Sequence, residues 1–182
     1  MFFLYQILII ILLILSPLII GIRILKKKED KIRFKEKFCF PSKKRVKGNL
    51  IWFHGSSVGE ILSILPLVYE LEKNNSINQI LITSSTLSSA EIFKKFKFTK
   101  TVHQFFPIDS IFFSHKFLKY WKPTITIFVE SEIWPSIFKT LNRKNIPLLL
   151  LNARITKKTF IKWNYVKSFS KNIFRNISMA YP

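Results

Sequence analysis

The 182-residue sequence has little glycine, cysteine or histidine, and these shortages exclude several kinds of site. Its four glycines form neither a G-x-G-x-x-G fingerprint nor a G-x-x-x-x-G-K-[ST] loop, so a glycine-rich phosphate cradle is excluded. The single cysteine, Cys39, cannot form an internal disulfide and fits a reducing compartment. The three histidines, His54, His103 and His115, show no metal-ligand spacing. We therefore expect neither a metal site nor an organic cofactor.

Acidic residues are also scarce, and none follows Glu132. Thirty Lys and Arg against ten Asp and Glu give a formal net charge of +20. This excess predicts anionic partners, namely nucleic acid, an acidic membrane face or a phosphorylated substrate. Genome-wide nucleotide bias can also scatter lysines through a protein. The block Lys26–Lys47 is different, because it places eleven basic and three acidic residues beside an apolar segment. We expect that block to contact anionic headgroups.

The apolar segment Phe2–Ile22 contains no charged residue. As a helix it spans roughly 30 Å, the thickness of a bilayer core. A cleaved signal peptide is the alternative, but no basic residue precedes the run and no small-x-small site follows it. We predict an uncleaved transmembrane anchor over 1–25 and a basic juxtamembrane linker over 26–49. Because basic residues follow the anchor, the positive-inside rule places the remaining chain on the cytoplasmic face.

Residues 50–182 alternate between apolar runs and helical patterns, which predicts an α/β domain with a Rossmann-like parallel sheet. The sequence predicts strands over 50–54, 79–83, 101–105, 124–129 and 147–151, with the opening of another at 177–181. It predicts helices over 60–73, 87–97, 110–121, 133–144 and 158–174. In such sheets, ligands bind where strands end and helices begin.

The turn after the first strand permits two interpretations. Gly55-Ser-Ser-Val-Gly59 matches the G-x-S-x-G elbow of serine hydrolases and acyltransferases, with Ser57 as the nucleophile. That chemistry needs a histidine and an acid later in the chain, and the candidates are Asp109 and His115. In the second interpretation Glu60 is the active group. A carboxylate in the first turn of a helix is stabilised in its ionised form and can act as a general base. It can also simply cap the helix.

Further motifs follow the later strands, on the same predicted edge of the sheet. They are Thr83-Ser-Ser-Thr86, Phe106-Pro-Ile-Asp109, Glu130-Ser-Glu-Ile-Trp-Pro135 and Asn152-Ala-Arg154. Together with His54-Gly-Ser-Ser-Val-Gly-Glu60, this series resembles the amino-terminal half of the 3-deoxy-D-manno-octulosonic acid (Kdo) transferase family over roughly residues 50–156.

The resemblance implies the amino-terminal, acceptor-binding half of an inverting glycosyltransferase of the glycosyltransferase-B fold. It implies a lipid A precursor as acceptor, CMP-Kdo as donor, and a location at the bacterial inner membrane. Glu60 corresponds to the proposed general base of the family, and Glu130 or Glu132 to a second important glutamate. We predict Glu60 and Glu130 as catalytic residues. The predicted substrate-binding residues are Ser56, Ser57, Gly59, Thr83, Asp109, Glu132 and Arg154.

Two further expectations concern the whole chain. The sequence stops at Pro182, so we expect residues 50–182 to hold the acceptor, with the donor-binding domain absent and no transfer by this chain alone. A different class of function is a membrane-tethered basic module that binds anionic lipid or nucleic acid without catalysis. It explains the charge but not the carboxylates at strand ends, and for the transferase we expect no nucleic acid partner.

Overall fold

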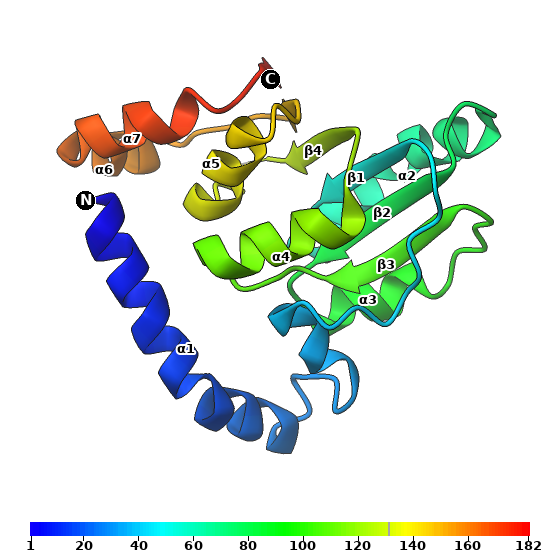
Figure 1. Cartoon of the computed structure of the whole chain (residues 1–182), viewed down its shortest axis with the longest axis horizontal. Helices are drawn as coiled ribbons and strands as arrows, with labels where there is room; N and C mark the ends of the chain where they lie inside the picture. The colour runs from blue at the N-terminus through cyan, green and yellow to red at the C-terminus, as the bar shows by residue number, and fades with distance from the viewer. Residues whose placement is uncertain (131) are drawn as a thin grey trace.

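The structure is a computed structural model that describes residues 1–130 and 132–182. Its centre is a six-stranded parallel sheet with strand order β3-β2-β1-β4-β5-β6 (Figure 1). The strands are β1 (Leu50–His54), β2 (Gln79–Ser84), β3 (Thr101–Phe105), β4 (Ile125–Val129), β5 (Leu148–Leu151) and β6 (Met179–Tyr181). The helices of this domain are α2 (Val58–Lys73), α3 (Leu87–Phe93), α4 (Ile111–Trp121), α5 (Pro135–Arg143), α6 (Lys157–Tyr165) and α7 (Lys167–Phe174).

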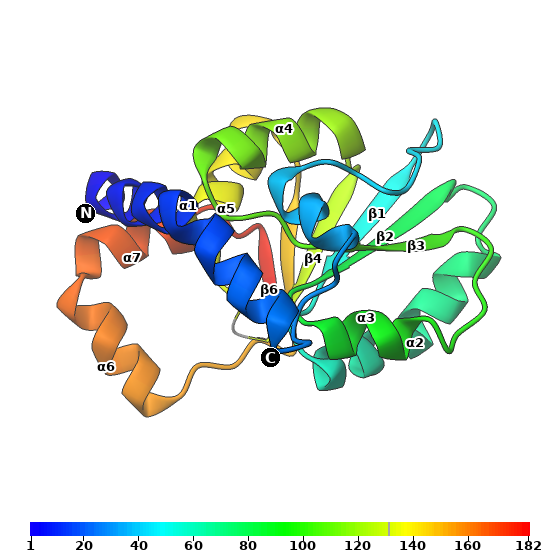
Figure 2. The same cartoon turned by 90° about the horizontal axis from the view of Figure 1, so that it is seen from below.

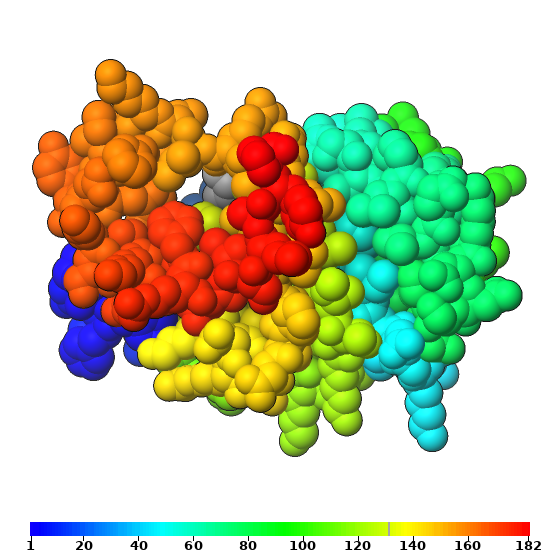
Figure 3. All heavy atoms as spheres, turned by 90° about the horizontal axis from the view of Figure 1, so that it is seen from above, coloured from blue at the N-terminus to red at the C-terminus, as the bar shows by residue number. Residues whose placement is uncertain are grey.

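The strands are apolar on both sides because helices cover both faces of the sheet. Trp52 of β1 packs with α4 and α5, whereas its neighbour Phe53 packs with α2. The same alternation recurs on β4, where Phe128 faces α5 and Ile127 faces α2. Figure 2 shows α2 and α3 on one side of the sheet and α4 on the other, and in Figure 3 α6 and α7 lie at the opposite end of the molecule from α2. The predicted Rossmann-like fold is thereby confirmed.

One predicted helix is two helices in the structure. The segment 158–174 breaks at Val166, whose backbone (φ −118°, ψ 40°) leaves the helical region. The break lets Trp163 of α6 pack edge-on against Phe174 of α7, with ring centroids 5.4 Å apart. Aromatic contacts of this geometry add to the apolar burial, so two short helices form where one straight helix was expected.

The predicted linker 26–49 is more ordered than we expected. It contains the 3-10 helix η1 (Arg33–Phe38), which is bound to the end of β3. Glu36 is buried, forms an ion pair with Arg33 and accepts a hydrogen bond from the Phe105 N–H at 2.7 Å. Arg33 Nη2 donates to the carbonyl oxygen and to Nδ1 of His103, both at 2.9 Å. The segment therefore forms part of the folded domain.

The buried His103 provides a pH-dependent contribution to stability. Burial, followed by the nearby Arg33 guanidinium, lowers the pKa of His103 to about 3. The unfolded chain protonates this imidazole near pH 6.5 and the folded chain does not, so the free energy of unfolding falls as the pH drops from about 6.5 towards 3. The expected slope from this group is roughly 1.4 kcal/mol per pH unit. Denaturant unfolding measured between about pH 3 and 6.5 should show this fall in the free energy of unfolding. The His103→Gln variant should show a smaller fall. If the free energies of unfolding of the two proteins changed in parallel with pH, His103 would not be the cause.

The amino-terminal helix α1 (Phe2–Leu25) is long and apolar enough to cross a membrane, judged by length and composition. Most of its surface is uncovered by the rest of the chain. In Figures 1 and 2, α1 extends along one side of the domain, with its first turn beside α5 and α7. These features are compatible with membrane association.

Candidate functional site

The predicted motifs converge where the strand order reverses. β1 is hydrogen-bonded to β2 on one side and to β4 on the other, so the crossover from β3 to β4 brings chain from the far edge back beside β1. Open α/β sheets bind ligands at such a switch point, outside the carboxyl ends of the strands. The turn after β1 carries Ser56, Ser57 and Glu60, and the segment after β4 carries Glu130 and Glu132.

Glu60 is held in a capping box at the start of α2. Ser57 is the N-cap, and its Oγ accepts from the Glu60 N–H at 3.2 Å while donating to Glu60 Oε1 at 2.7 Å. The other carboxylate oxygen, Oε2, accepts from the Ser56 N–H at 2.9 Å. Glu60 is 8% exposed, and these two donors orient its carboxylate at the amino end of α2. Glu60 therefore does cap its helix, and a carboxylate in this position can also act as a general base.

The two glycines of this turn differ in what they allow. A Cβ on Gly55 would lie 2.9 Å from Glu60 Cβ, closer than real Cβ contacts, so only glycine lets the Glu60 side chain fold over the turn. A Cβ on Gly59 would meet nothing closer than Ser57 Oγ at 3.9 Å. Gly55 is thus required by packing, whereas Gly59 leaves the first turn of α2 uncrowded beside the predicted substrate-binding serines.

Glu132 lies in the segment after β4 and contacts the same turn. Its Oε2 accepts from Ser56 Oγ at 2.6 Å and from Trp134 Nε1 at 2.9 Å. Burial raises the pKa of Glu132, but the adjacent His54 and the hydrogen bonds from Ser56 and Trp134 outweigh burial and hold the pKa below its usual value. Ser56 therefore links two carboxylates, with its N–H on Glu60 and its hydroxyl on Glu132. We define Ser56, Ser57, Glu60 and Glu132 as the carboxylate cluster.

His54 lies beneath the cluster and was absent from our predicted site residues. Its Nδ1 lies 3.0 Å from the Thr83 hydroxyl and 3.2 Å from the Thr83 carbonyl oxygen. The opposite nitrogen, Nε2, is 3.4 Å from Glu132 Oε2, a long contact. Thr83, predicted to bind substrate, is fully buried and orients His54 and the Trp52 indole instead. The sequence feature that could have identified His54 as a site residue is its position directly before the Gly-Ser turn.

Among the described residues, Glu130 forms no hydrogen bond or ion pair with the carboxylate cluster. It adopts φ 58°, a conformation that non-glycine residues seldom adopt, as the chain turns at the end of β4. Its Oε1 accepts from Arg154 Nη2 at 3.1 Å, and the Arg154 side chain is 68% exposed. The two residues lie at an apolar cavity of about 230 Å³ between α6, α7 and the β5–β6 edge. The structure thus pairs the two predicted site residues Glu130 and Arg154 with each other.

Asp109 is a buried cap on α5. Its side chain accepts from the N–H groups of Ser136 and Ile137, at 2.9 and 2.8 Å, and from the hydroxyl of Tyr5 at 2.6 Å. Burial raises the pKa of Asp109 above its usual value, despite the opposing effect of these donors. With 3% of its surface exposed, Asp109 fixes the helix that follows the E-S-E-I-W-P motif, which is a positioning role.

The serine hydrolase interpretation finds no support in these contacts. Ser57 is bound to Glu60, while Asp109 is occupied at the start of α5. His115 lies on α4 and lines a surface hollow with Phe112 and Lys116. Among residues 1–130 and 132–182, no hydrogen bond joins Ser57 to either partner that a triad would need. Likewise, no group of three or more His, Cys, Asp or Glu in the described part could hold a metal ion.

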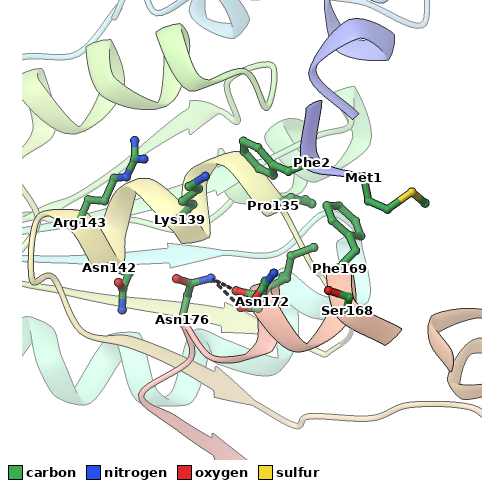
Figure 4. Close-up of a pocket in the computed structure, with 11 residues that line it drawn as sticks. Met1, Phe2, Pro135, Lys139, Asn142, Arg143, Ser168, Phe169, Asn172 and Asn176 are labelled. Carbon is green, nitrogen blue, oxygen red and sulfur yellow. Dashed lines mark hydrogen bonds between the residues drawn. The ribbon is translucent and has the colours of Figure 1, made fainter. Parts of the chain in front are cut away.

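Another cavity lies away from the cluster, between α5 and α7. It has a volume of about 420 Å³ and is closed at one end by Met1 and Phe2. Figure 4 shows the Lys139 and Arg143 side chains extending from α5 on the side away from Asn172 and Asn176, with Lys139 beside the Phe2 ring. Its lining contains two basic residues and no acidic one.

Comparison with known proteins assigns the family. The family model described as 3-Deoxy-D-manno-octulosonic-acid transferase (kdotransferase) matches residues 32–182. The 3-deoxy-D-manno-octulosonic acid transferase of Rickettsia bellii is 41% identical over 177 residues, which cover 96% of this chain and 42% of that protein. A probable mitochondrial 3-deoxy-D-manno-octulosonic acid transferase of Arabidopsis thaliana is 38% identical, over 82% of this chain and 34% of its own length.

A solved structure of UDP-N-acetylglucosamine 2-epimerase shares the fold, with a TM-score of 0.50 at 12% identity over 74% of this chain and 42% of that one. The chain spans less than half the length of the curated relatives described above. The family match nevertheless covers the whole sheet, including both motifs that flank the switch point. The chain belongs to the 3-deoxy-D-manno-octulosonic acid transferase family.

Proposed function

We propose that this chain is the acceptor-binding part of an enzyme that transfers Kdo from CMP-Kdo to a lipid A precursor in lipopolysaccharide biosynthesis. The family membership supports this reaction, and one structural observation supports the site. That observation is the carboxylate cluster, in which Glu60 and Glu132 meet on Ser56 at the topological switch point. An oriented pair of carboxylates at this edge suits proton transfer to and from a bound hydroxyl.

Glu60 is the proposed general base. The acceptor hydroxyl would attack the anomeric carbon of Kdo from the face opposite the phosphate, and its proton would pass to Glu60 as the new bond forms. The bond from the anomeric carbon to the CMP phosphate oxygen breaks in the same displacement, which inverts the configuration. Ser57 and the Ser56 N–H already direct the Glu60 oxygens, so the base is positioned before the acceptor arrives.

Glu132 is the proposed acceptor-positioning group. Its lowered pKa keeps it ionised, and a charged acceptor oxygen can bind further sugar hydroxyls strongly. Donor binding is assigned to the part of the longer relatives that this chain does not cover. The phosphates of the acceptor suit a chain with net charge +20, and Arg154 is a candidate phosphate contact because its guanidinium is largely exposed.

The proposed location is the cytoplasmic face of the bacterial inner membrane. The apolar α1 and the basic segment that follows it support association with an anionic membrane surface. That α1 crosses the bilayer once remains a prediction from the sequence.

The reaction is tested with membranes of cells that express the full-length gene product. We expect CMP-Kdo and a purified lipid A precursor to give a product whose mass is increased by one or more Kdo units. Membranes carrying the Glu60→Gln variant at equal protein level should form this product at least about 100-fold more slowly. Product formation that is equal in the variant would contradict the proposed base, and the absence of transfer by the natural protein would contradict the proposed reaction.

A further inference from the structure

The helix α1 is fixed to the domain near both of its ends. In its first turns, Tyr5 donates to buried Asp109 at 2.6 Å and Gln6 Nε2 donates to Ser136 Oγ at 2.8 Å. At its other end, Arg23 forms an ion pair with Glu29 at 3.0 Å. Lys37 of η1 binds the same Glu29 at 2.6 Å, and η1 is bound to β3. Both ends of α1 therefore contact one folded domain.

This arrangement differs geometrically from a membrane crossing. A helix of 24 residues is about 36 Å long, and a bilayer core is about 30 Å thick. If α1 crossed the core, its first turn would lie on the opposite side of the membrane from Arg23. Tyr5 could then not reach Asp109, which lies inside the same domain that holds η1. The hydrogen bonds at the two ends place both on one side.

The middle of α1 is apolar and uncovered. Only Ile9, Ser16 and Ile20 are buried in it, and the polar side chains Tyr5 and Gln6 are those that contact the domain. Large apolar side chains point outward along its length: Phe3, Leu4, Leu8, Ile10, Ile11, Ile14, Leu15 and Leu18. Helix and domain together are thus amphipathic, with exposed large apolar side chains along most of the length of α1.

Cationic groups lie at both ends of this apolar surface. Lys26, Lys27 and Lys28 follow its carboxyl end, and the cleft with Lys139 and Arg143 adjoins its amino end (Figure 4). Among the described residues, no carboxylate forms an ion pair with Lys139 or Arg143. An apolar strip between two unpaired basic sites matches acyl chains between anionic headgroups.

We propose that α1 lies in the plane of one leaflet of an anionic phospholipid bilayer, with its exposed side among the acyl chains and both ends at the same headgroup layer. The Tyr5–Asp109 hydrogen bond holds the helix on the domain in this position. Because Asp109 also caps α5, the same contact links membrane docking to the helix that follows Glu132. The inference does not depend on the transfer chemistry.

The side on which the amino terminus lies decides between the two arrangements. A hydrophilic epitope tag placed before Met1 of the full-length protein must lie in water on one side of the membrane. We expect added protease to remove it in inverted inner-membrane vesicles and to leave it intact in spheroplasts. Removal in spheroplasts would overturn the proposal, because it would put the amino terminus across the bilayer.

A proximity test examines docking directly. The ammonium of Lys139 lies 4.1 Å from the Phe2 ring centroid, so the pair Phe2→Cys and Lys139→Cys should be joined by a short bifunctional thiol reagent in intact membranes. The native Cys39 should not interfere, because burial raises the pKa of its thiol to about 12. No cross-link in phosphatidylglycerol-containing membranes, with both cysteines labelled after detergent treatment, would overturn the proposal.

The hydrogen bond itself is tested by Tyr5→Phe in the double-cysteine protein. Removing one hydroxyl from a partly buried bond to a buried carboxylate should lower the cross-link yield severalfold. The matched control is Phe3→Leu, two residues away and on the exposed side of the helix, which should leave the yield unchanged. Equal yields in Tyr5→Phe and Phe3→Leu would show that this contact does not hold the helix.

Discussion

Replacing Glu60 by Gln should reduce Kdo transfer by about 10²- to 10⁴-fold, the range that a general base contributes. The amide cannot take the acceptor proton. It can still occupy the third helical position of the capping box, where Gln is accepted as readily as Glu. We therefore expect the thermal midpoint of the full-length variant to stay close to that of the natural protein, and acceptor binding to be retained.

Ser57→Ala is the matched control because it should lower stability while largely retaining activity, the reverse of what we expect for Glu60→Gln. It removes the N-cap oxygen that accepts from the Glu60 N–H, which should cost about 1 kcal/mol of stability. It leaves the Ser56 N–H to orient the Glu60 carboxylate, so transfer should fall only a few-fold. Thermal unfolding and a single-turnover transfer assay on both variants separate the two effects.

The opposite result would identify a different mechanism. If Ser57→Ala abolished activity while Glu60→Gln did not, Glu60 would be a cap only and Ser57 would be the reactive group. If both variants unfolded at lower temperature and lost activity together, the turn would act as a structural unit, and the assignment of Glu60 as base would lose its support.

The fold was predictable because its signals are local. Each strand is a short apolar run followed by a polar turn, and four of the domain's helices begin at a Ser or Thr whose side chain accepts from the backbone three residues later. The break at Val166 was not predictable in this way. It depends on Trp163 meeting Phe174 across two helices, and a helical pattern continues through it.

The edge of the sheet on which the site residues lie was also predictable, but their roles were not. Any residue that follows a parallel strand lies on that edge, whether it points out of the sheet or under a helix. Asp109 follows β3 as expected, yet it is buried against α5 and Tyr5, which lies over a hundred residues away in sequence. Such long-range partners carry no local pattern, and for the same reason the segment around η1 resembled a linker.

The sequence also left open which glutamate of the E-S-E motif serves the site, and the contacts now separate the two. Glu132 shares Ser56 with Glu60 and is bound to Trp134, whereas Glu130 pairs with the exposed Arg154. Ion pairs as exposed as this one are worth about 0–1 kcal/mol, while hydrogen bonds to a partly buried charge are worth roughly 1.5–3 kcal/mol. Loss of the charge at the two positions should therefore have unequal effects.

We expect Glu132→Gln to lower kcat/KM about 10- to 100-fold and Glu130→Gln to lower it less than about 5-fold, both measured against the lipid A precursor. The two variants are matched in chemistry, lie two residues apart and leave the positive φ of Glu130 unchanged. A larger effect at Glu130 would restore it as the second catalytic residue predicted from the motif. It would also place the reacting hydroxyl of the acceptor beside Glu130 and the apolar cavity next to α6, because Glu130 contacts no member of the carboxylate cluster among the described residues.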